Sequence, residues 1–165
     1  KIFRRSKNSA TDYAHETVSL REYLVSLRKS KKKVPALICM IYPTAILLKP
    51  KDITQSLKII KKNKNVDVVM GISKYNYSPY KALSYNSKGH LKPVLPSKIM
   101  RRSQQYQQTF ASNGTIYWHR TETFLKGKYQ GHYGNKMIGY LMDYDVSLDI
   151  DNKSDLKKIL TYYNL

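Results

Sequence analysis

The run Pro35-Ala-Leu-Ile-Cys-Met-Ile-Tyr42 is the stretch from which the fold of this 165-residue chain can be predicted. It is continuously apolar and ends at Pro43-Thr44, which is typical of a strand covered on both faces in a parallel sheet. A second run of this kind is Val66-Asp-Val-Val-Met-Gly-Ile-Ser73. Between the two runs, apolar residues at helical spacing predict a helix from Asp52, which can cap it, to about Lys62. The order strand, helix, strand predicts a β-α-β unit with a right-handed crossover.

The flanking sequence continues this alternation of helices and strands. Helical periodicity is found in residues 16–28, 121–126 and 154–162, and strand-like runs in residues 113–118, 137–142 and 145–150. Residues 80–86, a turn at 87–90 and residues from 91 onward predict a hairpin, followed by a polar loop to residue 112. We therefore predict a single α/β domain over residues 1–165, a sandwich with a mostly parallel sheet. Ligands bind such sheets at the carboxyl ends of strands, where Thr44, Ser73, Asp149 and Asp151 lie.

Asp149 and Asp151 lie two residues apart in the run Val146-Ser-Leu-Asp-Ile-Asp151, just before a predicted helix. Residues i and i+2 of a strand project to one face, and two carboxylates there repel each other unless a cation lies between them. Mg²⁺ takes one or two carboxylates and completes its shell with water and phosphate oxygens. The pair therefore predicts a metal site for nucleotide chemistry. The alternative is a plain helix start, with Asn152 or Ser154 as N-cap and Asp155 in the first turn.

The composition narrows the class of protein. Hydrophobic residues make up 41% of the chain, which predicts a folded core, and no apolar run approaches the ~20 residues of a membrane span. The formal net charge of +19 would suit a nucleic-acid-binding protein, but it comes mostly from lysines scattered over predicted helix faces and turns. The single Cys39 is predicted to be a buried, inert thiol, in keeping with a cytoplasmic protein. The four histidines show no ligand spacing, and we assign them no role.

Five short segments form, in their order and spacing, a pattern more specific than any one of them. They are Phe3-Arg-Arg-Ser6 with Ala10-Thr-Asp12, Tyr42-Pro-Thr-Ala45, Ser78-Pro-Tyr-Lys-Ala-Leu83, Arg102-Ser-Gln-Gln105 with Asn113-Gly-Thr-Ile-Tyr117, and Asp149-Ile-Asp-Asn152 with Asp155. With these segments the chain resembles, over about residues 2 to 161, the bacterial cytidylyltransferases that make CMP-sialic acids. It looks most like the branch that activates pseudaminic acid.

The resemblance implies a Rossmann-like nucleotidyltransferase fold of the glycosyltransferase-A-like kind, a three-layer sandwich. It also implies an enzyme that transfers CMP from CTP to a nine-carbon 2-keto sugar acid and releases pyrophosphate, for surface glycan biosynthesis. The anomeric hydroxyl of the sugar would attack the α-phosphate, while Mg²⁺ and cationic side chains neutralise the phosphate charge. Asp149 and Asp151 match the family's metal-ligand aspartates, and Mg²⁺ held there would lower the pKa of the attacking hydroxyl.

The same match assigns binding roles to further residues. Arg5 and Thr44 match positions beside the nucleotide, for which the alternatives are a surface arginine and a threonine that caps a turn. Lys81 matches a lysine that holds the carboxylate of the sugar acid. Gln104 and Gln105 match a pair that hydrogen bonds to sugar hydroxyls and acyl amides. The alternatives for these three are a solvated lysine and polar loop residues.

Two matches lie in the strand predicted at 113–118, and several departures bear on the substrate. Asn113 begins the strand under the pocket, and Tyr117 matches a tyrosine that lines the substrate site, with a core tyrosine as the alternative. Sialic-acid enzymes have Gln before Pro-Thr where this chain has Tyr42, and Arg before Gln-Gln where it has Ser103. These departures favour a modified sugar such as pseudaminate or legionaminate over N-acetylneuraminate.

The largest departure concerns the phosphate site. The family begins with a strand and a loop rich in Gly, Ser, Arg and Lys that wraps the CTP triphosphate, and this chain has no such segment. The resemblance therefore implies an N-terminally truncated domain without its first strand and phosphate loop, with a sheet edge left open.

The sequence is compatible with three functions. The first is an active cytidylyltransferase, and the second is a non-catalytic or degenerate relative that serves as a binding or partner domain. The third, a basic nucleic-acid-binding protein, is disfavoured by the scattered lysines. Members of the family are commonly homodimers, which implies a dimer here with residues 85–135 in much of the interface. Neither nucleic acid nor a membrane is expected as a partner.

Overall fold

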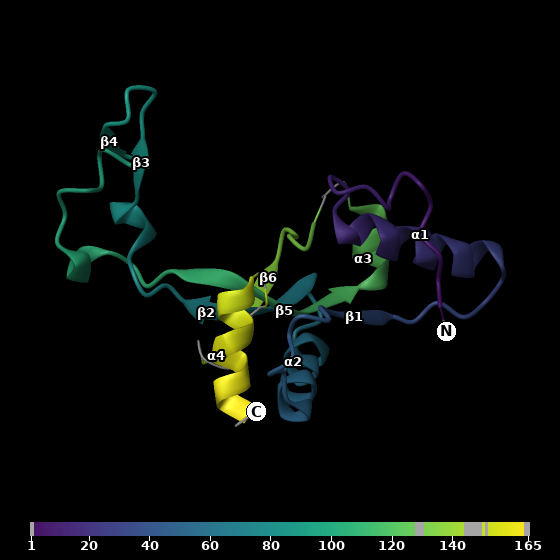
Figure 1. The fold of residues 1–165 in the computed structure, drawn as a ribbon. Helices are drawn as coiled ribbons and strands as arrows, with labels where there is room; N and C mark the ends of the chain where they lie inside the picture. The colour runs from purple at the N-terminus through teal and green to yellow at the C-terminus, as the bar shows by residue number, and fades with distance from the viewer. Residues whose placement is uncertain (1, 128–130, 144–149, 151, 164–165) are drawn as a thin grey trace.

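A four-stranded sheet with helices around it forms the body of the protein, and a two-stranded hairpin projects from this body (Figure 1). The computed structural model describes residues 2–127, 131–143, 150 and 152–163. In chain order the elements are α1 (Glu16–Lys29), β1 (Leu37–Ile41), α2 (Pro50–Lys62), β2 (Val68–Lys74), β3 (Leu83–Tyr85), β4 (Leu91–Pro93), β5 (Phe110–Arg120), α3 (Thr121–Lys126), β6 (Met137–Leu141) and α4 (Lys153–Tyr163). Short 3₁₀ turns, η1 (Pro79–Lys81) and η2 (Ser103–Gln105), belong to the projecting part.

The sheet has the strand order β1-β5-β2-β6. β5 runs antiparallel to both of its neighbours, and the β2–β6 pair is parallel. The prediction of a mostly parallel sheet is therefore wrong, and a Rossmann-like parallel sheet is not confirmed. β1 and β2 do run in the same direction, as the predicted β-α-β unit requires, but β5 lies between them. A continuous apolar run indicates that a strand is covered on both faces, but it does not indicate the direction of the neighbouring strands.

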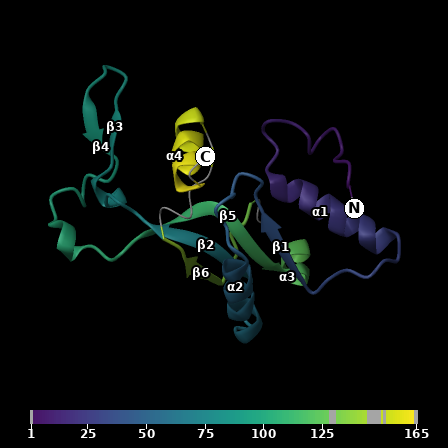
Figure 2. The ribbon, with the colours of Figure 1, turned by 60° about the horizontal axis from the view of Figure 1, so that its bottom comes forward.

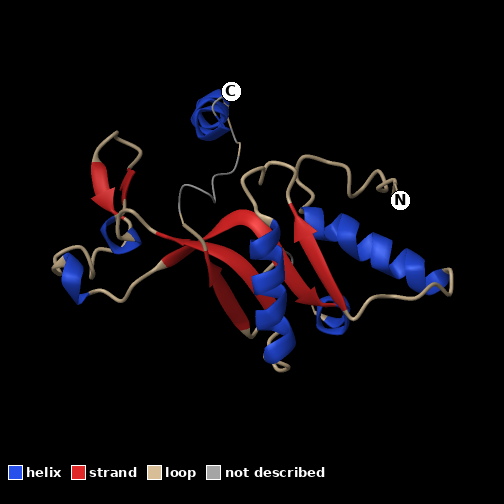
Figure 3. Ribbon diagram, turned by 90° about the horizontal axis from the view of Figure 1, so that it is seen from below, coloured by secondary structure: helices blue, strands red, loops and turns tan. Residues whose placement is uncertain are grey.

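The two faces of the sheet carry separate parts of the core, because alternate residues of a strand point to opposite sides. On one face Val69, Ile116 and Trp118 pack with Ile60 of α2. Trp118 also donates from Nε1 to Ser56 Oγ at 3.0 Å. On the other face Ile38 packs with Leu24 of α1 and Phe124 of α3. Figure 3 shows α2 crossing the sheet, and Figure 1 shows α1 and α3 on the opposite side.

The helix ends follow from local hydrogen bonding. α2 begins at Pro50, two residues before the predicted start, because Asp52 accepts the amide of Lys49 through Oδ2 at 2.9 Å and so caps the helix from within its first turn. α4 is capped by Asn152, whose Oδ1 accepts the amides of Ser154 and Asp155 at 2.8 and 3.1 Å. This confirms the predicted helix start beside Asp151. None of the helices in the described ranges has the length and apolar character needed to cross a bilayer.

Residues 75–109, here called the arm, leave the sheet after β2 and return to it as β5 (Figure 2). The predicted hairpin is confirmed: β3 and β4 are antiparallel, and Gly89 has the positive φ of 77° that the turn between them needs. Tyr80 and Tyr106 hold the base of the arm together, with ring centroids 4.8 Å apart. Two-stranded hairpins are marginally stable alone, so these contacts matter for the position of the whole arm.

Substitution of the buried Leu24 side chain tests directly whether α1 packs on the sheet. Leu24 is fully buried, whereas its neighbour Val25 is exposed on the same helix. Leu24→Ala should lower the free energy of unfolding by about 2–5 kcal/mol, since it removes buried methyl groups and leaves a cavity. Val25→Ala should change it by less than about 0.5 kcal/mol. Urea denaturation of both variants measures the difference, and equal losses would mean that α1 is not packed on the sheet through Leu24.

Candidate functional site

A polar cluster joins the carboxyl end of β2 to the start of β5. Asn113 donates from Nδ2 to Ser73 Oγ at 3.3 Å, and its Oδ1 accepts from the amide and the hydroxyl of Thr115 at 3.3 and 2.7 Å. Asn113 is half-buried, so its amide is within reach of a ligand at this end of the sheet. Gly71 is required beneath it, because a Cβ there would lie 2.6 Å from Asn113 Oδ1. The cluster thus places hydrogen-bonding groups where α/β sheets bind ligands.

The end of β1 lies on the same side of the molecule as this cluster. The turn after β1 is closed by a hydrogen bond from the amide of Ala45 to the carbonyl of Tyr42, and it leaves Thr44 half-buried. The Tyr42 ring lies 5.6 Å from the Tyr117 ring, centroid to centroid. Tyr117 is only 5% exposed and shares a hydrogen bond of 2.8 Å with Ser112 Oγ. The structure therefore brings Thr44, Tyr117 and Asn113 to one end of the sheet, with Tyr117 in the core layer.

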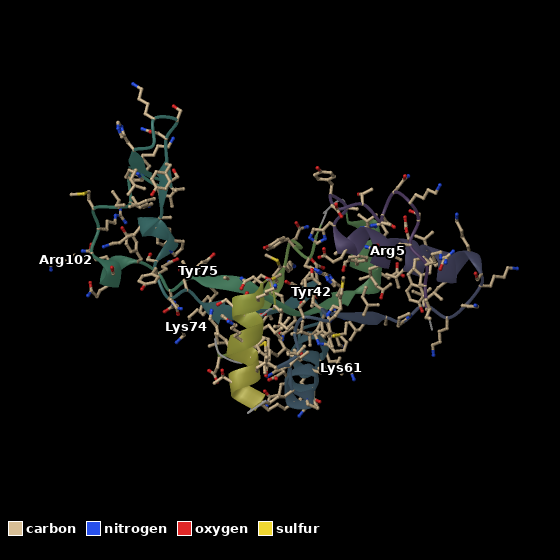
Figure 4. The ribbon with its side chains drawn as sticks, in the orientation of Figure 1. Arg5, Tyr42, Lys61, Lys74, Tyr75 and Arg102 are labelled. Atoms are coloured by element: carbon tan, nitrogen blue, oxygen red, sulfur yellow. The ribbon has the colours of Figure 1, made fainter. Side chains whose placement is uncertain are left out.

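The other candidate residues lie outside this cluster. Lys81 ends η1 and Gln104 and Gln105 lie in η2, so all three belong to the arm, where they are exposed. Arg5 is exposed in the segment before α1, which is tied to that helix through Ser6 and Glu22. Figure 4 shows Arg5 and Arg102, which precedes η2, at opposite ends of the molecule with Tyr42 between them. One copy of the chain does not gather all the predicted binding residues.

The predicted metal ligands Asp149 and Asp151 lie outside the described residues. In the described parts of the chain, no group of three or more His, Cys, Asp or Glu side chains is arranged to hold a metal ion.

Cys39 is a free thiol, and burial raises its pKa to about 12, so the thiol stays protonated at neutral pH as predicted for an inert residue.

A buried network that sequence analysis did not find links α1 to the sheet. Glu16 Oε1 accepts from the Tyr42 hydroxyl and lies 2.9 Å from Nε2 of His132. His132 Nδ1 lies 2.9 Å from Nε2 of His119, and the His132 ring stacks on Tyr117 with centroids 3.6 Å apart. His119 and His132 are 2% and 4% exposed. The four connected side chains run from the turn after β1 to the far end of β5.

Burial decides the protonation of this network. Removal from water lowers the pKa of His119 to about 3, with a further contribution from His132. Burial also lowers the pKa of His132 to about 4, although Glu16 acts in the opposite direction. Burial alone would raise the pKa of Glu16, but its hydrogen bond from Tyr42 and the neighbouring histidines bring it below the usual value. At neutral pH the network therefore holds one carboxylate and two neutral imidazoles.

The network could not be recognised from short intervals in the sequence. Tyr42 is 26 residues from Glu16 and 90 from His132, and His132 is 13 residues from His119. Histidines that act through tertiary contacts do not show the short intervals of a metal-binding motif. Tyr42 was the one available indication, since it departs from the family pattern at a strand end.

Comparison with solved structures shows a likeness of fold, whereas comparison with sequences shows no relative. No protein-family model and no curated protein sequence matches the chain. A solved structure of CMP:2-keto-3-deoxy-manno-octonic acid synthetase complexed with CTP superposes with a TM-score of 0.58 and 12% sequence identity. The match covers 93% of this chain and 70% of that one. The chain has the fold of that synthetase.

The two buried histidines make stability depend on pH. Their folded-state pKa values lie below the unfolded value of 6.5, so the unfolded chain binds more protons as the pH falls. The free energy of unfolding should therefore fall between pH 6.5 and pH 5 by up to about 1.4 kcal/mol per pH unit for each histidine. The pKa of Glu16 is lowered from 4.5, so this carboxyl titrates below the window.

Urea unfolding at several pH values measures this slope. His119→Gln should make the slope shallower, because one buried titrating group is lost. His90→Gln serves as the control, since His90 is exposed on the arm, and it should leave the slope unchanged. A wild-type stability that does not change between pH 6.5 and 5 would contradict the buried, neutral state of the network.

Proposed function

We propose that this protein is a CTP-dependent cytidylyltransferase that transfers CMP to a 2-keto sugar acid. The observation that carries the proposal is the likeness of fold, over 93% of the chain, to a synthetase that was solved with CTP and is named for a CMP-sugar acid. The ordered segments that resemble CMP-sialic acid synthetases point independently to the same class of reaction. In this reaction a sugar hydroxyl forms a bond to the α-phosphorus of CTP, and the bond to pyrophosphate breaks.

The nucleotide would bind at the carboxyl ends of β1 and β2. Thr44 and Asn113, both half-buried, provide a hydroxyl and an amide group there that can position a ribose or a base by hydrogen bonds, and the buried Ser73 orients Asn113. Asn113 is already oriented by Ser73 and Thr115, so little conformational freedom is lost when a ligand binds. Arg5 would add a cation for the phosphates. The net charge of +19 favours the approach of a polyanion such as CTP.

The sugar acid would be held by the arm. Lys81 supplies an ammonium group for a carboxylate, and Gln104 and Gln105 supply donors and acceptors for hydroxyl and acyl amide groups. Gln105 Oε1 accepts the amide of Arg102 at 3.2 Å, which leaves its amide nitrogen available. Tyr42 and Ser103, where sialic-acid enzymes have Gln and Arg, support a pseudaminic- or legionaminic-type substrate.

We propose Mg²⁺ as the cofactor, and this proposal rests only on the presence of Asp149 and Asp151 in the sequence. These two carboxylates would hold it against the triphosphate, and the ion would supply charge neutralisation at the phosphates. Asn152 directly follows Asp151 and caps α4, so the helix fixes the position of the chain immediately after the pair.

Pyrophosphate release tests the proposal. The protein in its full native length is given CTP and Mg²⁺ with pseudaminic, legionaminic, N-acetylneuraminic or 2-keto-3-deoxy-manno-octonic acid. Asn113→Ala should lower kcat/KM by about 10- to 100-fold, as expected for a lost hydrogen bond to a charged or reacting ligand. Asn76→Ala, an exposed asparagine on the arm, is the matched control and should have no effect. No pyrophosphate from any of the four acids, with the fold confirmed by circular dichroism, would overturn the assignment.

We further propose a homodimer formed through the arm. Leu83, Tyr85 and Leu91 share one face of the hairpin, because Tyr85 pairs with Leu91 and Leu83 lies two residues before Tyr85. This face is left uncovered, with Tyr85 73% and Leu91 59% exposed. A second copy of the chain that covered it would also bring arm residues from one subunit toward the body of the other.

The mass in solution tests the dimer. Light scattering should give twice the chain mass for the wild type and the single mass for the double variant Tyr85→Lys, Leu91→Lys, since two ammonium groups cannot be buried in an apolar contact. Thr54→Lys on the exposed side of α2 is the control and should remain dimeric. A monomeric wild type would refute the proposal without affecting the assignment of the reaction.

A further inference from the structure

The Glu16–His132–His119 network has a defined direction of hydrogen bonding. Glu16 is ionised at neutral pH, so the nitrogen of His132 that faces it must carry the proton and donate. His132 is neutral, and its Nδ1 is therefore an acceptor for the proton on His119 Nε2 at 2.9 Å. His119 is neutral as well, which leaves its Nδ1 without a proton. The carboxylate thus fixes the tautomer of both imidazoles.

A cavity of about 250 Å³ lies at the other end of this network. It is formed where β2 and β6 begin and β5 ends, so it lies at the opposite end of the sheet from Ser73 and Asn113. Val68 and the Phe124 ring give it an apolar wall. The polar side chains around it come from Asp67, His119, Thr123, Lys126, Tyr133 and Asn135.

His119 lines this cavity, and its unprotonated nitrogen is the ring atom not used in the network. No side chain or backbone group in the described ranges hydrogen bonds to His119 Nδ1. In the same part of the chain, Ser78 Oγ is the one side-chain polar atom that is both fully buried and without a partner. Nδ1 is therefore reached by solvent although His119 is only 2% exposed, and the cavity that His119 lines is the space through which it is reached. Because His119 Nδ1 is an acceptor without a hydrogen-bond donor in the described part of the protein, it favours a ligand that donates to it.

The charges around the cavity restrict the class of ligand. The acidic side chain of Asp67 and the acceptor nitrogen of His119 both disfavour the acceptor oxygens of an anion such as phosphate. A cation would meet Lys126 at the rim and the net charge of +19 of the chain. A neutral molecule with several hydroxyl groups satisfies both acceptors, and its C–H groups can lie against the apolar wall of Val68 and Phe124. The volume lies below the 300 Å³ or so at which drug-sized sites begin, which suits a single sugar ring.

We infer that this cavity is a second small-molecule site, which binds a neutral polyhydroxylated ligand of monosaccharide size with a hydroxyl donating to His119 Nδ1. The site is independent of the proposed CTP site, because the two lie at opposite ends of the sheet and share no lining residue. The Glu16–His132 pair acts as its positioning element, since it keeps the proton of His119 on Nε2.

Saturation-transfer NMR with the full-length protein tests the site. The probes are glucose, galactose, mannose and N-acetylglucosamine, with glucuronate and inorganic phosphate as anionic comparisons. We expect at least one neutral sugar to bind, and its binding should move the ¹⁵N resonance of His119 Nδ1 toward the value of a hydrogen-bonded nitrogen. The anions should bind at least tenfold more weakly.

A pair of surface variants locates the binding. Thr123→Trp fills the cavity from its rim and should weaken sugar binding more than tenfold. Thr54→Trp is the matched control on α2, because both threonines are exposed and both donate to a backbone carbonyl in their own helix turn, at 3.0 Å and 2.9 Å. It should leave binding unchanged. The proposal fails if no neutral sugar binds, if Thr123→Trp binds as the wild type does, or if the His119 nitrogen does not respond.

Discussion

The central constraint on this structure is the antiparallel insertion of β5 between β1 and β2. Its pairing with both neighbours joins β1 to β2 in one sheet and sets the register from Leu37 opposite Arg120 to Lys74 opposite Phe110. One face of β5 supplies Ile116 and Trp118 to the core under α2, and the other face supplies Tyr117 and His119 to the buried network. Both candidate sites follow from this strand, because its first residues carry the Asn113 cluster and its last residues border the second cavity.

The sequence was sufficient to place most elements and insufficient to orient them. Apolar runs at 35–42 and 66–73 became β1 and β2, and the hairpin at 80–93 was found from its turn residues. The direction of β5 could not be predicted, since the 35-residue arm that connects it to β2 permits either orientation of a strand. The predicted start of α2 is two residues too late. The prediction begins the helix at Asp52, but Asp52 caps α2 from the third helical position, where its side chain reaches back to the amide of Lys49.

The candidate nucleotide site was accessible from sequence because its residues lie at strand ends within short segments that resemble a known family. Thr44 and Asn113 were identified in this way, and the structure places them at one end of the sheet. The histidine network was not accessible, because it depends on contacts between α1, β5 and the segment at residue 132. Each histidine alone is an ordinary core or surface residue, and only the packing of α1 on β5 makes them a connected chain.

We propose that this fold binds a nucleotide at the carboxyl ends of β1 and β2. An NMR titration with CTP, followed at the backbone amides, tests this most directly. Amide resonances of a ¹⁵N-labelled protein are followed while CTP and Mg²⁺ are added. We expect the largest shifts at Thr44, Ser73 and Asn113, with His119 and Thr123 unaffected. Shifts centred on His119 and Thr123, or no saturable shifts at all, would contradict it.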